Sequence, residues 1–112
     1  MMVVLNADTG KVIETLPIGA GADAVAFDPK LSLAFASCGD GTLTVVHEDS
    51  PDQFSVVQTV ATRQGARTMA LDSKSHRIYL PTAKFAPAAT PGQRPQMIPG
   101  SFTILVVERP KQ

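Results

Sequence analysis

The sequence predicts an all-β protein, because of its short apolar runs, its turn residues and an internal repeat. No stretch keeps apolar residues at helical spacing without an interrupting Gly or Pro. Runs rich in Val, Ile, Leu and Thr stand roughly ten residues apart between turn residues, which is typical of antiparallel strands. The segment GADAVAFDPKLSLAFAS, from Gly21, returns in altered form as GARTMALDSKSHRIYLPT, from Gly65.

Nine strands are expected, each bounded by its own turn signals. They are expected near residues 2–6, 11–17, 22–28, 32–37, 42–48, 54–61, 66–72, 77–83 and 101–108. Gly10 supplies the first turn. Asp28 can accept a local backbone N–H while Pro29 presets φ for the next position, so a turn is expected there. Asp40-Gly41 favours a hairpin, because both residues tolerate a positive φ.

The repeat predicts how these strands group. A shift of 44 residues pairs Gly21 with Gly65, Ala22 with Ala66, Ala26 with Ala70, Asp28 with Asp72, Lys30 with Lys74 and Phe35 with Tyr79. The same shift pairs VIETL (12–16) with VVQTV (56–60), and a shift of 59 pairs TLTVV (42–46) with SFTIL (101–105). A period in the low forties is the length of one four-stranded propeller blade.

The predicted fold class is therefore all-β, with β-propeller blades of four-stranded antiparallel sheets that are incomplete within one chain. Residues 1–20 are expected to end one blade, 21–64 to form a complete blade, and 65–112 to form the last blade. The last blade carries a Pro-rich insertion at 84–100, where prolines remove backbone donors and disfavour strand. This insertion is either a surface excursion for partner contact or a simple bridge between two strands.

The stretch VVLNADTGKVIETLPIGAGADAVAFDP resembles the YVTN-type β-propeller repeat. The matching residues are Asp8, Thr9, Gly10, Lys11, Ile18, Gly19, Ala24, Val25, Ala26, Asp28 and Pro29. The chain departs from the pattern at Asp23, where proline is usual, and at LAFAS, where YVTN itself would stand; IYLPT, with Tyr79, is closer. The resemblance implies the C-terminal portion of a propeller, about two to two and a half blades. Such propellers serve as binding scaffolds, as surface-layer proteins and occasionally as enzymes, and are often periplasmic or extracellular.

A closed propeller commonly needs four to eight blades, and open ends expose apolar surface and strand edges. The chain is therefore expected to be part of a longer propeller or to close a ring by self-association. In the second case, the strand near Lys11 of one copy would complete the last blade of another. Three or four copies would then contact one another through strand edges and blade faces, giving six or eight blades.

The charges favour such contacts over nucleic acid. The net charge is zero, but residues 1–56 carry eight acids against two bases, and residues 57–112 carry eight bases against two acids. The bases stand singly and without aromatic partners, so no nucleic-acid partner is expected. Attraction between complementary ends of neighbouring copies fits the split better. The N-terminus has no basic leader and no long apolar run, so no signal peptide or membrane partner is expected, and localisation stays open.

Few residues are candidates for chemistry. Asp23 and Arg67 are equivalent in the repeat and enter the innermost strands, so they are the candidate binding residues at the mouth of a channel; solvated rim charges are the alternative. Lone Cys38 is expected to be a small buried strand residue. His47 is expected half-buried on a strand and His76 exposed in a turn, neither with a carboxylate at metal-ligand spacing. No motif for catalysis, a metal or a cofactor occurs, so none is expected.

The sequence thus predicts a non-enzymatic β-propeller module that acts as a scaffold for protein or small-ligand binding. The alternative is a fragment of a propeller enzyme, lactonase-like or amine-dehydrogenase-like, without its own complete active site. Propeller enzymes gather catalytic groups from many blades, and this chain has too few blades to supply such a set alone. The small-molecule ligand, if there is one, is left open.

Overall fold

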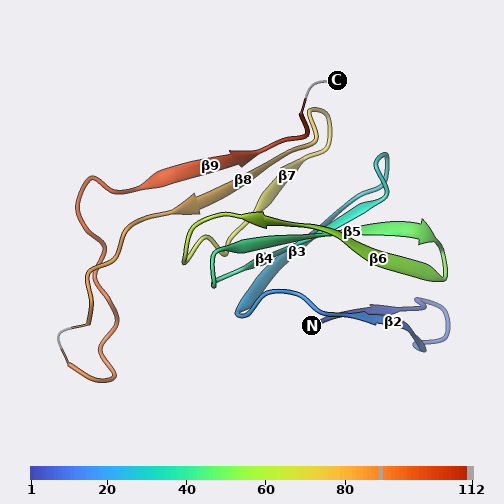
Figure 1. The fold of residues 1–112 in the computed structure, drawn as a ribbon, viewed down its shortest axis with the longest axis horizontal. Helices are drawn as coiled ribbons and strands as arrows, with labels where there is room; N and C mark the ends of the chain where they lie inside the picture. The colour runs from blue at the N-terminus through green and yellow to red at the C-terminus, as the bar shows by residue number, and fades with distance from the viewer. Residues whose placement is uncertain (89, 111–112) are drawn as a thin grey trace.

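A computed structural model describes residues 1–88 and 90–110, so Ala89, Lys111 and Gln112 lie outside the described residues. The described residues therefore leave out one position of the predicted insertion and the last two positions of the predicted last blade, which include the base Lys111. The described residues form nine β-strands and no helix (Figure 1). All pairings between the strands are antiparallel, so the all-β prediction is confirmed. Within this part of the chain there is no helix long and apolar enough to cross a membrane.

The nine strands form three separate sheets that follow one another along the chain. A hairpin contains β1 (Met2–Leu5) and β2 (Val12–Leu16). The four-stranded sheet contains, in order, β3 (Ala22–Asp28), β4 (Leu33–Cys38), β5 (Thr42–Ser50) and β6 (Gln53–Ala61). The three-stranded sheet contains β7 (Ala70–Asp72), β8 (Arg77–Thr82) and β9 (Thr103–Val107).

The three sheets lie in layers, with the four-stranded sheet in the middle (Figure 1). The main core lies between the four-stranded and three-stranded sheets and is built from buried apolar side chains: Phe35, Leu43, Val45, Ala66, Ile78 and Leu80. On the opposite side, Leu16 of the hairpin is buried and β2 contacts β6. Cys38 is fully buried on β4, as predicted. Because each sheet is one layer thick, burial depends on contact with the next sheet.

The strand predicted at 66–72 is much shorter in the structure, where β7 covers only Ala70–Asp72. Continuing the ladder from the pair Ala70–Tyr79 would bring residue 68 opposite Pro81, and proline has no N–H for a ladder hydrogen bond. The backbone before β7 is bound by side chains instead. The Ser37 hydroxyl donates to the carbonyl of Arg67, and the Thr82 hydroxyl donates to that of Gln64.

The register of β9 corrects the second repeat shift. Phe35 pairs with Val45 in the four-stranded sheet, and its equivalent Tyr79 pairs with Val106 in the three-stranded sheet. Val106 therefore corresponds to Val45, at a shift of 61 residues, and the predicted shift of 59 is wrong by two. A slip of two residues keeps every side chain on the same face of a strand, so the facing pattern is unchanged.

The Pro-rich insertion is mostly exposed and folds back on itself as a hairpin-like loop. Ala86 N donates to the carbonyl of Gln96 and Ile98 N to that of Lys84, both at 2.8 Å, around a single bridge between Phe85 and Met97. At its base, Lys84 N donates to the Ser101 hydroxyl at 3.0 Å. Four prolines in 84–100 remove donors that a longer ladder would need.

The loop between β4 and β5 contains three residues and ends at Gly41, whose φ is +95°. A Cβ at Gly41 would stand 3.1 Å from Gln64 N and 3.3 Å from the carbonyl carbon of Arg63, both of them backbone atoms. Gly10 also has a positive φ, +72°, but a Cβ there would meet nothing within 4 Å. Gly41 is therefore favoured both by its positive φ and by the nearby backbone, whereas Gly10 is favoured by its positive φ alone.

Gly41→Ala is expected to lower the free energy of unfolding by about 2 kcal/mol, because strained φ and backbone crowding act together. Gly10→Ala, the matched control, is expected to cost about 1 kcal/mol, from the positive φ alone. Urea unfolding followed by circular dichroism measures both. Equal losses for the two variants would contradict the role assigned to the Gly41 contact.

Candidate functional site

The two residues predicted to bind a ligand lie in different surroundings. Asp23 is exposed at an irregularity in the β3–β4 ladder, between Ala22 and Ala24. Arg67 is exposed in the segment before β7, and its side chain packs over Gly39, where an added Cβ would lie 3.0 Å from its Cδ. Neither takes part in the ion pairs found among residues 1–88 and 90–110. The structure therefore does not join them into one pair.

Asp40 connects two loops by hydrogen bonds, the β2–β3 loop and its own β4–β5 loop, at the end of the four-stranded sheet where β3 begins. Its Oδ2 accepts a hydrogen bond from Ala20 N at 2.9 Å, and its Oδ1 accepts the Thr42 hydroxyl at 2.6 Å and Thr42 N at 3.1 Å. The hydrogen bond from the Thr42 side chain, followed by that from Ala20, lowers the pKa of Asp40 below its usual 3.8. Asp40 is thus an ionised structural acceptor.

Asp28 and His76 form the one buried contact between ionisable side chains among the described residues. Asp28 ends β3 and is only 1% exposed, while His76 lies in the turn between β7 and β8 and is 26% exposed. Oδ1 of Asp28 accepts the backbone N–H of Lys30 and of Leu31, at 3.1 and 3.3 Å, as its predicted turn role requires. Oδ2 is hydrogen-bonded to His76 Nδ1. The prediction that His76 is exposed is therefore wrong.

This contact also determines the ionisation of Asp28. Burial alone would raise its pKa, but the hydrogen bond to His76, that from Leu31 N, the charge of His76 and the hydrogen bond from Lys30 N together lower it below 3.8. A buried carboxylate with three hydrogen-bond partners is stable in its charged form. The pair links two successive sheets at one end.

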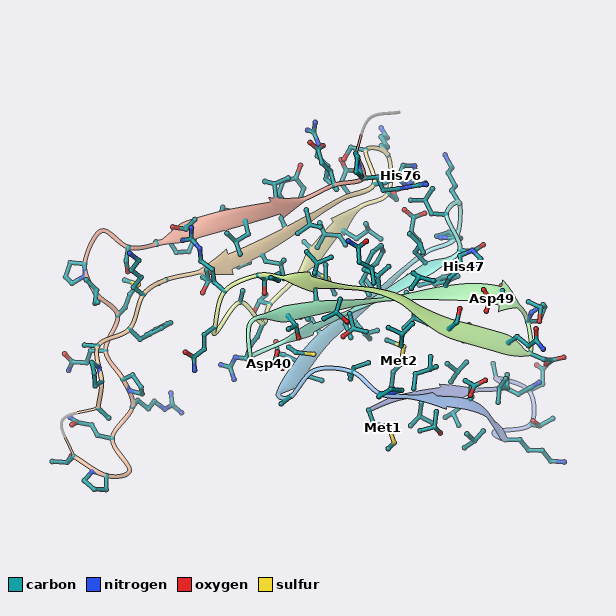
Figure 2. The ribbon with its side chains drawn as sticks, in the orientation of Figure 1. Met1, Met2, Asp40, His47, Asp49 and His76 are labelled. Atoms are coloured by element: carbon teal, nitrogen blue, oxygen red, sulfur yellow. The ribbon has the colours of Figure 1, made fainter. Side chains whose placement is uncertain are left out.

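His47 lies half-buried on β5, as predicted, but it has a carboxylate neighbour that the sequence analysis missed. Its Nδ1 lies 2.7 Å from Oδ1 of Asp49, and Oδ2 of Asp49 accepts the Ser55 hydroxyl at 2.8 Å (Figure 2). Residues two apart on a strand share a face, so the H-x-D spacing was the available signal. The hydrogen bond from His47, then that from Ser55, lowers the pKa of Asp49.

This pair does not extend into a metal centre. The described part of the chain holds no group of three or more His, Cys, Asp or Glu side chains that could bind a metal ion. Asp49 is also held by two neighbours on the surface, which is the arrangement of a structural surface pair. Figure 2 shows His47 and Asp49 towards one end of the four-stranded sheet and Asp40 towards the other.

The most distinctive surface features are two apolar sheet faces. The outer face of the three-stranded sheet is uncovered, whereas the face of the four-stranded sheet on the side of the hairpin is exposed along β3 and largely buried along β4 and β5. We name the face of each sheet that points along the chain towards the next sheet its forward face, and the opposite face its backward face. On the four-stranded sheet the forward face carries Phe35, Leu43 and Val45, all buried in the core. Their register equivalents on the three-stranded sheet are Tyr79, Ile104 and Val106, and the last two are each 53% exposed.

On the backward faces, the residues of the three-stranded sheet pack against the core and their equivalents on the four-stranded sheet are exposed. On the three-stranded sheet, Met69 and Leu71 pack against the core. Their equivalents at the 44-residue shift are Val25 and Phe27 on β3, which are 70% and 46% exposed. The exposed residues thus correspond, position by position, to residues that are buried or partly buried between the two sheets.

Two grooves run beside the uncovered regions. One, of about 430 Å³, lies between the end of β6 and β9, lined by residues 60–63 and 105–108. It runs along β9, whose only partner strand is β8. The other, of about 300 Å³, lies between β1 and the backward face of β3 and β4, lined by Met1–Val3, Val25 and Ala36 among others.

Comparison of the chain with protein-family models, with curated proteins and with solved structures returns no match. The internal repeat itself supplies a structural template for the uncovered faces. Within it, the contact between the four-stranded and three-stranded sheets shows how one such face is covered.

Proposed function

We propose that the chain is a non-enzymatic scaffold of the β-propeller type, in which each sheet is a blade and copies of the chain cover the outer faces. The observation that carries this proposal is the equivalence between exposed and buried residues. Repeating the step from the four-stranded to the three-stranded sheet would bring the face that carries Ile104 and Val106 in one copy against the face that carries Val25 and Phe27 in the next. Burying an apolar side chain of this size contributes about 1.5–3 kcal/mol.

Charge supports a second copy as the occupant of these faces. Val25 and Phe27 belong to the half of the chain with an excess of six acids, and Ile104 and Val106 to the half with an excess of six bases. A head-to-tail contact therefore brings opposite charges together, whereas contacts between like faces would bring like charges together. Head-to-tail contacts form a ring when the rotation between copies closes.

The strand edges support the same arrangement. In the four-stranded sheet, β6 is the fourth strand, and its segment 56–60 corresponds to 12–16 of β2. We infer that β2 of one copy pairs with β9 of another and fills the groove beside β9. β9 then takes the position that β1 holds in the single chain. β1 gives way because none of its side chains is fully buried, whereas Leu105 and Val107 of β9 pack against the core.

In such a ring the loops at the Asp40 end of each sheet gather around the central channel, together with the Pro-rich insertion. Asp23 and Arg67 recur there as alternating acidic and basic groups, which suits a polar ligand or a protein partner at the channel mouth. The resemblance to the YVTN-type repeat agrees with this scaffold role. Because ligand contacts then come from several copies, binding is expected only in the assembled protein.

Light scattering of the purified chain tests the proposal. We expect a molar mass of about 35 kDa for three copies of the 11.8 kDa chain, or about 47 kDa for four. The mass should hold over a tenfold range of concentration if the ring is closed, because a closed ring leaves no free face for further growth. A uniform monomer at all concentrations would contradict the proposal.

A further inference from the structure

The contact between Asp28 and His76 gives the register of the junction between two successive sheets. Asp28 lies in the β3–β4 turn and His76 in the β7–β8 turn, which are the equivalent turns of neighbouring sheets. The carboxylate is almost completely buried, so the neighbouring turn supplies a partner that solvent does not. The pair therefore fixes which turn residue stands beside which.

Both residues of this contact have equivalents in the repeat, each in the corresponding turn of the other sheet. At a shift of 44 residues, Asp28 corresponds to Asp72 and His76 corresponds to Ser32. Asp72 accepts the N–H of Lys74 at 3.1 Å, as Asp28 accepts that of Lys30 at 3.1 Å. Ser32 and His76 share the left-handed conformation, with φ of +54° and +62°. The two turns thus share a left-handed residue at this position and differ in its side chain.

The surroundings of the two carboxylates differ in one respect. Oδ2 of Asp28 contacts the neighbouring sheet through His76, whereas Oδ2 of Asp72 accepts only the hydroxyl of Ser75 from its own turn, at 2.6 Å. Asp72 is exposed, since it belongs to the outermost sheet. Its carboxylate stands at the position where the next sheet would offer a turn residue.

We propose that, in the ring inferred above and resting on it, Asp72 of each copy faces Ser32 of the next copy. Junctions within a chain then carry an Asp–His pair, and junctions between chains an Asp–Ser pair. A carboxylate–imidazole contact is stronger than a carboxylate–hydroxyl contact when the imidazole is charged. At a pH where the imidazole is charged, the junction between chains is therefore the weaker one, and the place where the ring opens.

Substitutions at Ser32 test this register in two directions. Ser32→His recreates the internal pair and is expected to tighten assembly about tenfold in dissociation constant at pH 6. His76 already shows that histidine is compatible with this turn conformation. Ser32→Asp sets two carboxylates against each other and is expected to weaken assembly about tenfold relative to Ser32→Asn. Asp and Asn have the same shape and both tolerate a positive φ, so the comparison isolates charge.

Assembly is measured by light scattering over a dilution series, and circular dichroism checks that each variant is folded. Asp72→Asn combined with Ser32→His should abolish the gain, because the acceptor charge is gone. If rings form but neither Ser32→His nor Ser32→Asp changes their dissociation, the register is wrong while the scaffold proposal stands. If the wild type and all variants stay monomeric, both proposals fail together.

Discussion

If the chain assembles as proposed, Ile104→Glu is expected to give a folded monomer. Ile104 is 53% exposed in the single chain, so a glutamate there keeps its hydration and leaves the fold intact. In the proposed ring it would occupy the position equivalent to Leu43, which is fully buried between two sheets. Burying an unpaired carboxylate at such a place is expected to weaken assembly by at least about a hundredfold.

Val57→Glu is the matched control for this experiment. Val57 is 54% exposed and lies on β6, at an irregularity of the ladder and outside the two outer faces. The proposed ring should tolerate it. Light scattering gives the molar mass of both variants, and circular dichroism gives their thermal unfolding. Assembly that survives Ile104→Glu, or that is lost equally in the control, would show that the forward face of the three-stranded sheet is not the contact.

The strands could be predicted from the sequence because their signals are local. Each run of Val, Ile, Leu and Thr between turn residues became a strand within a few positions of its predicted ends, apart from β7. There the deciding residue is Pro81, which stands on the neighbouring strand and so is invisible to a pattern read along 66–72. The shift of β9 was missed for a similar reason, since the insertion hides the register that pairing with β8 fixes.

The contact between Asp28 and His76 could not be predicted from spacing. The two residues are 48 positions apart, and their contact follows from how two sheets stack, which no local pattern encodes. The repeat identified Asp28 and Asp72 as turn residues but not the second role of Asp28. His47 and Asp49 are different, because their spacing of two on a strand was sufficient to place both on one face.

His76→Asn is expected to lower the free energy of unfolding by about 3 kcal/mol at pH 7. The substitution leaves the buried carboxylate of Asp28 with only its two backbone donors, and removing one partner of a buried charged contact is strongly destabilising. Asparagine tolerates the left-handed conformation of this turn, so backbone strain contributes little. Urea unfolding at one fixed chain concentration measures the loss, because the proposed assembly would also add to stability.

His47→Asn is the matched control, since it breaks a contact of the same two residue types on the surface. His47 and Asp49 are 40% and 42% exposed, so water replaces the lost partner and the change should be much smaller. Similar losses for the two histidine variants would contradict the special role of the contact between sheets.

Acid unfolding separates the charge of Asp28 from its packing. Because its pKa in the folded chain lies below 3.8, the ionised Asp28 contributes stability in full above pH 3.8, and this contribution is lost as the pH falls through the lower folded value. Without His76 the main lowering influence is gone while burial still raises the pKa, so His76→Asn should begin to unfold at a higher pH than the wild type.

Asp28→Asn has no charge to lose at this position, so adding His76→Asn to it should not move the acid midpoint. The exposed carboxylates of Asp40, Asp49 and Asp72 titrate in every variant and cancel in the comparison. An acid midpoint that is the same in the wild type and in His76→Asn would mean that the imidazole does not stabilise this carboxylate.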